Sequence, residues 1–509
     1  MKGAVASGHP LTARAAADMF SLGGNAFDAA VSAGFASVAA EPTLTSFGGG
    51  GFLLAHIEKQ NRDVLFDFFV NTPGLGWKEK PKTGMVPVNI DFSGCTQTFH
   101  IGCSSAAVPG LLKGLLHSHE RLCTLPLKTI IAPALSCLKD GLKISVLQEY
   151  FLNLLKPIFT SSDYGKEICT RNGRFIKSGD RLFNPMLENF FRGIADNTSD
   201  IYTGEIARKF IAEMKIQGGL ISQDDLDAYE VIEREPLHIK YRDREILTNP
   251  PPSSGGVKLA LALHLLENLE ISSLDHASET FLIPLVELMM ELHSFKPISN
   301  GNSISYPFPD SEISPILQQY IKSISDKSFI STQGTTHISV IDEEGNAVSM
   351  TTSNGSGSGY FIPGTGIMIN NMMGEDDLHP DGFFSSPRGQ RVSSMMIPTM
   401  VLKGGKVESV MGSGGSKRIK TAVLQVLLNL IDFSYSLEDA VEASRVHFED
   451  GIVQIEPDVP EEVVEKLGKH YKTNRWKKKN MYFGGVHCVN GRMQGWGDSR
   501  RGGCFLVSD

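Results

Sequence analysis

The sequence predicts an α+β protein whose helices and strands come from all parts of the chain. Three observations carry this prediction: alanine-rich helical patterns near the amino terminus, a hairpin pattern around residue 340, and a glycine-rich transition into a helix near residue 415. At 509 residues the chain exceeds the usual size of one core, yet no low-complexity linker divides it. We therefore expect one large intertwined unit or two interlocked layers.

The composition restricts the class of protein. Hydrophobic residues make up 41% of the chain and charged residues 21%, which is typical of a soluble globular protein. The formal net charge of -9 comes without a basic stripe, so nucleic acid is not expected as a partner. Seven cysteines without a paired CxxC spacing argue against a disulfide framework or a zinc ribbon.

No targeting or membrane segment stands out in the sequence. The first ten residues lack the apolar core of a signal peptide, and no run of about 18 apolar residues follows. A membrane is therefore not an expected partner. The expected compartment is the cytoplasm, although a chain that had lost a signal peptide would look the same.

The first part of the chain predicts two helices with small side chains on their packing faces, followed by two strands. The run Leu11 to Leu22 is alanine-rich and ends at a glycine pair, after which Asn25 can cap a second helix. A run of four glycines then leads into a strand at residues 52–57, with 63–69 as its partner. The glycines could cradle a phosphate, but no Lys-Ser/Thr follows them, so close backbone packing is expected.

The middle of the chain predicts mostly helices. We expect helices after Ala107 and over residues 127–138, and residues 156–229 alternate charged and apolar side chains at helical spacing. A rigid turn at residues 250–256 precedes a helix at 257–266, and further helices follow. The histidines here are isolated, without HExxH-like spacing, so no metal site is predicted.

Residues 335–353 predict a β-hairpin that organises the second part of the chain. Both arms, 335–342 and 347–353, are rich in β-branched residues and alternate small polar with apolar side chains. The Glu-Glu-Gly-Asn segment between them has the composition of a turn. The first strand therefore begins at Thr335.

The bond between Gly334 and Thr335 is a candidate site of self-cleavage. Residues 331–334 are small and polar, as in accessible loops where chains are cut. If the Thr335 hydroxyl attacked the Gly334 carbonyl and the ester were hydrolysed, Thr335 would become a new amino terminus. Its α-amine, with an ordinary pKa of roughly 7.7 to 8.0, could then act as the general base for its own hydroxyl. The alternative is an ordinary edge hairpin with surface threonines.

A glycine-rich segment, Val410 to Ser416, is expected to run into a long helix. Backbone N–H groups at such a helix start suit an oxyanion. The alternatives are a phosphate-binding turn or a purely structural one. Around it we expect a loop that approaches a ligand at 354–360, a turn and short strand at 363–371, a strand at 400–403 with a turn at 404–405, and a helix capped by Ser436.

Taken together, these motifs resemble the γ-glutamyltransferase (γ-glutamyltranspeptidase) family of amino-terminal-nucleophile hydrolases. One such motif is weak evidence, whereas this many in the order of the family are strong evidence. The resemblance runs nearly end to end. It rests on Gly8-His9-Pro10-Leu11, Phe47 through Phe52, Val108-Pro109-Gly110, Pro251 through Gly256, Thr335-Thr336-His337, Asn370-Asn371, Ser393-Ser394-Met395 and Gly412 through Ser416.

The resemblance implies a four-layer αββα sandwich that is made as a precursor and cuts itself into two intertwined subunits. Residues 1–334 would form a large subunit, with helical layers and part of the central sheets. Residues 335–509 would form a small subunit, with the nucleophile strand, the substrate loops and the oxyanion turn. These self-derived subunits are expected to stay together.

The resemblance also implies roles for single residues. Thr335 would be the nucleophile both of cleavage after Gly334 and of catalysis. Ser353 stands where the family usually has a threonine that orients the nucleophile. Ser393 and Ser394 match the family's serines that bind the substrate carboxylate. Gly414 and Gly415 match the paired glycines of its oxyanion hole.

Four departures from the family pattern bear on the substrate. Where classical members have an arginine that binds the substrate α-carboxylate, this chain has Phe69 within Asp67-Phe68-Phe69-Val70, so a bidentate charge clamp is lost. The glutamine after the Asn-Asn pair is Met372, and the aspartate that holds the α-amino group matches Glu375. The loop after the hairpin is about two residues shorter, and Asn354 matches the asparagine that the family has there.

The sequence thus predicts an autoprocessing threonine amidohydrolase or acyltransferase of the γ-glutamyltransferase type. Its expected partner is a small-molecule amide, such as a γ-glutamyl compound like glutathione, and no cofactor or metal is expected. An acyl-threonine intermediate passes the acyl group to water or to an amine. Two alternatives stay open: a glutaryl-type or other small-acyl amide acylase on the same fold, and a non-catalytic binding member.

Overall fold

A computed structural model describes residues 1–78, 84–91, 96–294, 334–379 and 382–508 of the protein. Both helices and strands occur throughout these residues, which confirms the mixed α and β composition expected from the sequence. Residues 331–333 of the expected cleavage loop lie outside the described residues. Gly334 and Thr335, on either side of the expected cleavage bond, lie within them.

The larger main sheet has seven strands in the described part of the chain, each antiparallel to its neighbours. Strands from the beginning, middle and end of the sequence lie side by side in it. In spatial order they are β10 (Ile232–Arg234), β3 (Arg62–Phe68), β2 (Gly50–Ile57), β14 (Ala347–Gly355), β13 (Gly334–Asp342), β1 (Gly3–Ser7) and β22 (Cys504–Ser508).

The expected hairpin forms the centre of this sheet as β13 and β14. Asp342 closes its turn, because its Oδ1 accepts hydrogen bonds from the N–H groups of Glu344 and Asn346, both at 3.0 Å. The register places Thr335 opposite Ser353. The hairpin is therefore buried at the sheet centre, not at an edge, and this excludes the alternative of an edge hairpin with surface threonines.

A second main sheet has six strands in the described residues. In spatial order they are β11 (Leu237–Tyr241), β12 (Arg244–Thr248), β15 (Thr399–Lys403), β16 (Lys406–Gly414), β20 (Gly485–Asn490) and β21 (Gly495–Gly497). All neighbouring pairs are antiparallel. The turn expected at residues 404–405 joins β15 to β16.

The two main sheets pack face to face, and side chains cross between them. Ser349 of β14 donates a hydrogen bond to the carbonyl oxygen of Met411 in β16 (2.9 Å), and Ser339 of β13 donates to that of His487 in β20 (2.9 Å). A β-carbon on Gly412 would lie 2.3 Å from the ring of His337, so this glycine makes room for the histidine. The nucleophile strand is thus enclosed by a second sheet.

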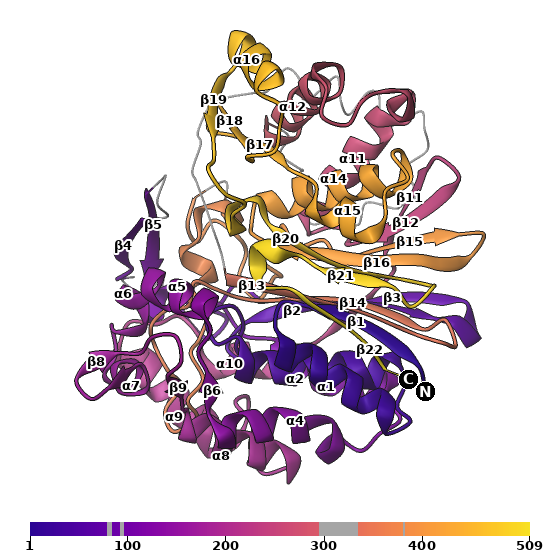
Figure 1. Ribbon diagram of the computed structural model, residues 1–509. Coiled ribbons are helices and arrows are strands. Elements are labelled where there is room, and N and C mark those ends of the chain that lie inside the picture. Colours follow the sequence, from indigo (N-terminus) through magenta and orange to yellow (C-terminus); the bar gives the residue numbers. More distant parts are fainter. Residues whose placement is uncertain (79–83, 92–95, 295–333, 380–381, 509) are drawn as a thin grey trace.

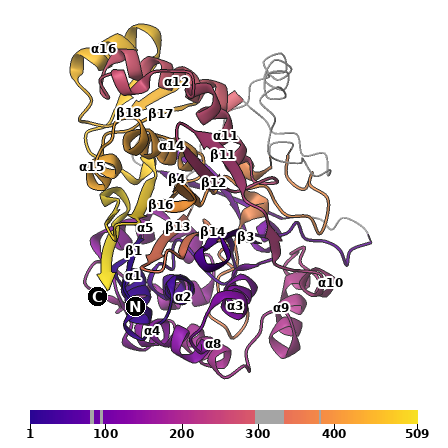
Figure 2. The same cartoon turned by 90° about the vertical axis from the view of Figure 1, so that its right-hand side faces the viewer.

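Helices cover the outer side of each sheet (Figure 1). In both views α1 (Pro10–Ser21), α2 (Ala26–Ala40) and α4 (Leu127–Asp140) lie beyond the seven-stranded sheet, while α11 (Ser254–Leu266) and α14 (Arg418–Ile431) lie beyond the six-stranded one (Figure 2). Asn25 caps α2 through a capping box, as expected. The two chain ends meet where β1 pairs with β22.

Smaller elements complete the described chain. The remaining helices are α3 (Leu111–Leu122), α5 (Val146–Leu154), α6 (Lys156–Phe159), α7 (Asp163–Ile168), α8 (Pro185–Ala195), α9 (Gly204–Ile216), α10 (Gln223–Asp227), α12 (Glu279–Ser294), α15 (Leu437–Glu442) and α16 (Glu461–His470). The remaining strands are β4 (Val86–Asp91), β5 (Thr96–Ile101), β6 (Leu142–Lys143), β7 (Thr170–Arg171), β8 (Arg174–Phe175), β9 (Arg181–Leu182), β17 (Val446–Glu449), β18 (Ile452–Ile455) and β19 (Lys472–Arg475).

Two local expectations differ from the structure. The segment expected to form a glycine-rich turn continues β16 as far as Gly414, because Gly414 pairs with Gly485 of β20, and only residues 415–417 turn before α14. The short strand expected near residue 369 is reduced to isolated bridges, from Ile369 to Gly48 and from Met368 to Phe361. Tertiary pairing decided both outcomes, and it cannot be read from local composition.

Candidate active site

Thr335 is the second residue of β13 and lies buried opposite Ser353. Its Oγ1 donates a hydrogen bond to Ser353 Oγ (3.2 Å), which in turn donates to the carbonyl oxygen of Gly334 (2.6 Å). The N–H of Gly355 donates to the same serine hydroxyl (3.0 Å). One hydroxyl therefore connects the candidate nucleophile to the carbonyl group of its own preceding peptide bond.

The two glycines predicted to form an oxyanion hole lie beside Thr335. A β-carbon on Gly414 would lie 2.3 Å from the Thr335 carbonyl oxygen, so glycine is required for this close approach. Gly415 has φ +124°, a conformation that residues with side chains rarely adopt. The structure thus brings together the predicted nucleophile and both predicted glycines.

Two buried charged residues that the sequence analysis did not single out flank this group. Arg501 donates a hydrogen bond from Nη1 to the Thr335 carbonyl oxygen (3.3 Å). Glu41, which follows α2, accepts hydrogen bonds from the hydroxyls of Thr336 and Thr12, both at 2.7 Å. Burial lowers the pKa of Arg501 to about 10 and raises the pKa of Glu41 despite its two hydroxyl donors.

Two neutral histidines fill the space between the sheets near the site. The Nδ1 of His337 lies 2.8 Å from the Thr351 hydroxyl, and its Nε2 lies 2.9 Å from that of Ser339. Burial lowers the pKa of His337 well below its ordinary value of 6.5 and lowers that of His487 to about 4. Both rings are therefore uncharged near pH 7 and act as packing and hydrogen-bonding groups.

Glu375 lies next to the end of the hairpin. Its Oε1 accepts a hydrogen bond from the N–H of Ser356 (3.2 Å), and Asn371 Oδ1 accepts one from the same N–H (2.8 Å). A β-carbon on Gly355 would lie only 2.3 Å from Glu375 Oε1. Because Gly355 is the strand partner of Gly334, the predicted substrate-binding carboxylate lies close to the candidate cleavage bond.

The other predicted substrate residues lie in two places. Asn354 is buried in β14, and its Oδ1 has no hydrogen-bond partner among the described residues. Ser393 Oγ donates to the carbonyl oxygen of Pro252 (3.0 Å), and the Ser394 carbonyl accepts from the N–H of Ser254 (2.9 Å). Within the described chain these serines bond to the turn before α11, to the first residue of α11 and within their own loop, not to Thr335.

Phe69, at the position where classical family members have a carboxylate-binding arginine, belongs to the hydrophobic core. Phe69 is 2% exposed and stacks on Phe52 with ring centroids 5.5 Å apart. Asp67 pairs with Arg234 (2.8 Å) and Arg391 (3.0 Å). Arg391 also donates to several backbone carbonyl groups. Phe69 thus offers no charge to a substrate, and both nearby arginines are already paired.

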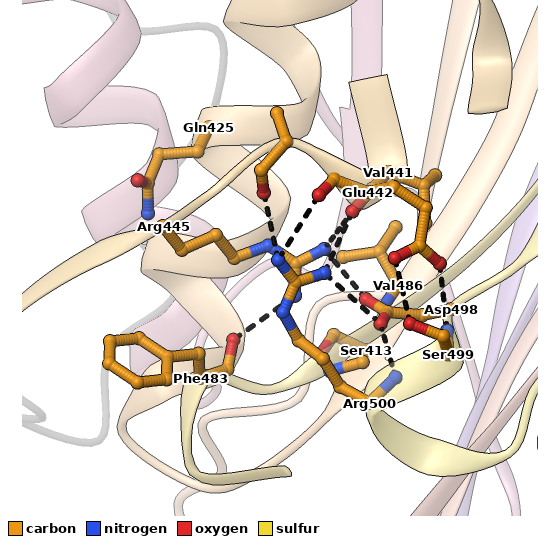
Figure 3. Close-up of polar contacts among 12 residues, drawn as sticks. Ser413, Gln425, Val441, Glu442, Arg445, Phe483, Val486, Asp498, Ser499 and Arg500 are labelled. Carbon is orange, nitrogen blue, oxygen red and sulfur yellow. Dashed lines mark hydrogen bonds and ion pairs between the residues drawn. The ribbon is translucent and has the colours of Figure 1, made fainter. Parts of the chain in front are cut away.

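A buried ion-pair network holds the segment that carries Arg501 (Figure 3). Asp498 pairs with Arg445 (2.7 Å) and with Arg500 (3.2 Å), and Arg500 also pairs with Glu456. Asp498 Oδ2 accepts the N–H of Val486 in β20 (2.9 Å). Burial alone would raise the pKa of Asp498, but the two arginines and two backbone donors lower it to about 2.

Three further features concern metals, thiols and membranes. In the part of the chain that the structure describes, no group of three His, Cys, Asp or Glu side chains is arranged to hold a metal ion. The six cysteines found there are free thiols. None of the described helices is long and apolar enough to span a bilayer.

Comparisons with known proteins agree with this arrangement. A family model described as Gamma-glutamyltranspeptidase matches residues 12–507. The chain belongs to the γ-glutamyltranspeptidase family. The match extends from Thr12, which donates to Glu41, past Arg501, so the site described above lies within it, and the resemblance seen in the sequence is confirmed.

The relatives of this γ-glutamyltranspeptidase family member include acylases and glutathione hydrolases. The Acylase ACY 1 proenzyme of Pseudomonas sp. (strain SE83) is 33% identical over 486 residues, which cover 92% of this chain and 86% of that protein. The Glutathione hydrolase proenzyme of Escherichia coli (strain K12) is 29% identical over 483 residues, which cover 88% of this chain and 81% of that protein. A crystal structure of cephalosporin acylase from Bacillus halodurans has the same fold, with a TM-score of 0.83 at 22% identity over 99% of this chain and 95% of that one.

Proposed function

We propose that this protein is an autoprocessing threonine amidohydrolase with the four-layer αββα sandwich of amino-terminal-nucleophile hydrolases. Residues 1–334 and 335–509 are its two intertwined subunits. The observation that carries the proposal is the hydrogen-bond chain from Thr335 Oγ1 through Ser353 Oγ to the Gly334 carbonyl oxygen. Membership of the family, whose relatives include proenzymes, supports it.

This geometry supports self-cleavage. Thr335 Oγ1 attacks the carbonyl carbon of Gly334, while the Ser353 hydroxyl donates to the oxygen that becomes negative. The C–N bond breaks, an ester joins Gly334 to the threonine oxygen, and the released α-amine takes up the proton. Water then hydrolyses the ester, which leaves a Gly334 carboxylate and a free amino group on Thr335.

Turnover repeats the attack on a substrate amide. The α-amine of Thr335 takes the proton of its own hydroxyl, and Oγ1 attacks the amide carbonyl carbon. The N–H groups of Gly414 and Gly415 stabilise the oxyanion, and one well-placed donor of this kind is worth about 3 to 4 kcal/mol. The leaving amine takes the proton, an acyl-threonine remains, and water or an acceptor amine releases the acyl group.

Cleavage is tested by denaturing electrophoresis and intact mass spectrometry of freshly purified protein. We expect a piece of 334 residues and, since the chain has 509, a second of 175 residues that begins with Thr335. A small piece with another first residue would defeat the proposal. So would full amidase activity from an uncut chain, and an uncut, inactive protein would favour the non-catalytic alternative.

The proposed substrate is a γ-glutamyl amide such as glutathione, with Glu375 facing its amino group. A glutaryl-type or other small-acyl amide is the second candidate. Phe69 favours it, because a buried phenylalanine replaces the expected carboxylate clamp, and so does the similarity to an acylase. A chromogenic γ-glutamyl anilide and the matching glutaryl anilide separate the two. Turnover of only the glutaryl compound would exclude the γ-glutamyl assignment.

A further inference from the structure

Arg501 is a buried cation with incomplete hydrogen bonding. The residue is 3% exposed, and its one hydrogen bond to Thr335 is long at 3.3 Å. Its Nε and Nη2 have no hydrogen-bond partner among the described residues. An unmade hydrogen bond on a buried charge costs stability, so such donors are normally satisfied. The preceding Arg500 follows that rule, since it pairs with both Asp498 and Glu456.

Three glycines make room for this guanidinium beside the nucleophile. A β-carbon on Gly485 would lie 2.5 Å from Arg501 Cδ, and β-carbons on Gly414 and Gly415 would lie 2.9 Å from Nη1 and 3.3 Å from Nη2. Standard bond lengths keep the backbone nitrogen of a residue within about 3.6 Å of its own carbonyl oxygen. With the 3.3 Å contact added, the Thr335 nitrogen lies no more than about 7 Å from Arg501 Nη1.

We propose, on the basis of the function proposed above, that the Arg501 guanidinium keeps the α-amine of Thr335 unprotonated near neutral pH. The amine can accept the hydroxyl proton only when it is neutral, and a nearby positive charge disfavours its ammonium form. Arg501 acts through the amine and does not itself react, so it is a positioning residue. One charge at about 7 Å shifts such a titration by about one to two pH units.

Other groups around the site oppose or support Arg501. Carboxylates favour the ammonium form, but each of the three is engaged: Glu41 accepts from two hydroxyls, Asp498 pairs with two arginines, and Glu375 accepts the N–H of Ser356. We therefore expect a net lowering of about one pH unit. The groups that face this region are the carboxylates of Glu41, Asp498 and Glu375, the guanidinium of Arg418, and the neutral rings of His337 and His487.

The test measures the titration of the Thr335 amine in the cleaved protein without any substrate. Trace acetylation by acetic anhydride across a pH series is read by mass spectrometry of the first peptide of the small subunit. The wild-type amine should titrate near pH 7 or below, under the ordinary range of roughly 7.7 to 8.0. In Arg501→Gln the midpoint should rise by about one unit, and Arg501→Lys, which keeps the charge, should stay close to the wild type.

Arg492→Gln is the matched control, because it removes an exposed charge from the turn between β20 and β21 and should leave the titration unchanged. A wild-type midpoint in or above the ordinary range overturns the proposal, as does an Arg501→Gln midpoint equal to that of the wild type. A folded Arg501→Gln chain that stays uncut also overturns it, because Arg501 would then act in cleavage. If that variant does not fold, the wild-type and Arg501→Lys midpoints decide.

The two proposals fail in different ways. A wild-type chain that is never cut defeats the threonine amidohydrolase itself. A cut chain whose amine titrates in the ordinary range leaves the amidohydrolase intact and removes only the role of Arg501.

Discussion

A single hydroxyl, that of Ser353, stands between Thr335 and the Gly334 carbonyl in the uncut chain. Thr335→Ala removes the attacking oxygen but leaves this serine and its hydrogen bond in place. We expect a folded, uncut chain without amidase activity, seen as one band on denaturing electrophoresis. Thr335→Ser keeps the oxygen and serves as the control, which should still be cut. Normal turnover by Thr335→Ala would show that another group is the nucleophile.

The buried histidines make stability depend on pH. His487 has a folded pKa near 4 against an ordinary 6.5, because burial disfavours its charge, and burial also lowers the pKa of His337 well below 6.5. The unfolded chain therefore takes up protons first as the pH falls. The contribution of these neutral histidines to the free energy of unfolding is fully present above about pH 6.5 and is lost between pH 6.5 and 4. For His487 alone the loss is roughly 3 kcal/mol.

Urea unfolding at a series of pH values checks this expectation. His487→Gln should lower stability at pH 7 but should give a shallower loss between pH 6.5 and 4. Equal slopes for the variant and the wild type would mean that His487 does not titrate in this range.

Single residues also mark the limit of what the sequence predicts. Thr335, Ser353 and the two glycines, Gly414 and Gly415, belong to motifs with fixed spacing, and the structure brings them together. Arg501 carries no such signal, because it reaches Thr335 from the short 3-10 helix Ser499–Arg501, through a gap left by Gly485 and neighbouring glycines. Pairing between distant segments, and not local pattern, decides which charges approach the nucleophile.

At the scale of elements, the contact between β13 and β16 decides whether the nucleophile strand is correctly placed. Gly412 faces the ring of His337, which two hydrogen bonds hold in position. The β-carbon of Gly412→Ala would lie 2.3 Å from that ring, so the ring or one of the sheets must shift. We expect a loss of about 1 to 3 kcal/mol in the free energy of unfolding, together with slower self-cleavage.

Urea unfolding and a time course on denaturing gels measure both effects. Gly468→Ala in α16 is the control, because its β-carbon would meet nothing closer than Thr473 Oγ1 at 3.8 Å. That variant should be as stable as the wild type or more so, since alanine suits a helix better than glycine. If both variants unfold at the same urea concentration, the sheets tolerate the extra methyl group.

Elements with a strong local signal were predictable, and those made by distant pairing were not. The alanine-rich helices, the Asn25 cap and the turn closed by Asp342 follow from local chemistry, and the structure has each of them. The extension of β16 through Gly414 depends on β20, which lies about 70 residues further along the chain. Sheet order depends on the same kind of contact.

At the scale of the whole molecule, the two proposed subunits alternate within the large sheet. The pairs β2–β14, β13–β1 and β1–β22 each join a strand from residues 1–334 to one from residues 335–509. In the second sheet, β12 and β15 form another such pair. Cutting the bond before Thr335 breaks none of these ladders.

Separation of the pieces would therefore require both sheets to unfold. We expect the cleaved protein to elute as one species in native size-exclusion chromatography, at the volume of uncut Thr335→Ala, and to unfold in one cooperative transition by circular dichroism. The same sample should give two bands only under denaturing conditions. Two native peaks, or a large piece that stays folded after the small one has left, would contradict the interleaved arrangement. Because each piece supplies strands that the other needs, neither can bury the shared core alone.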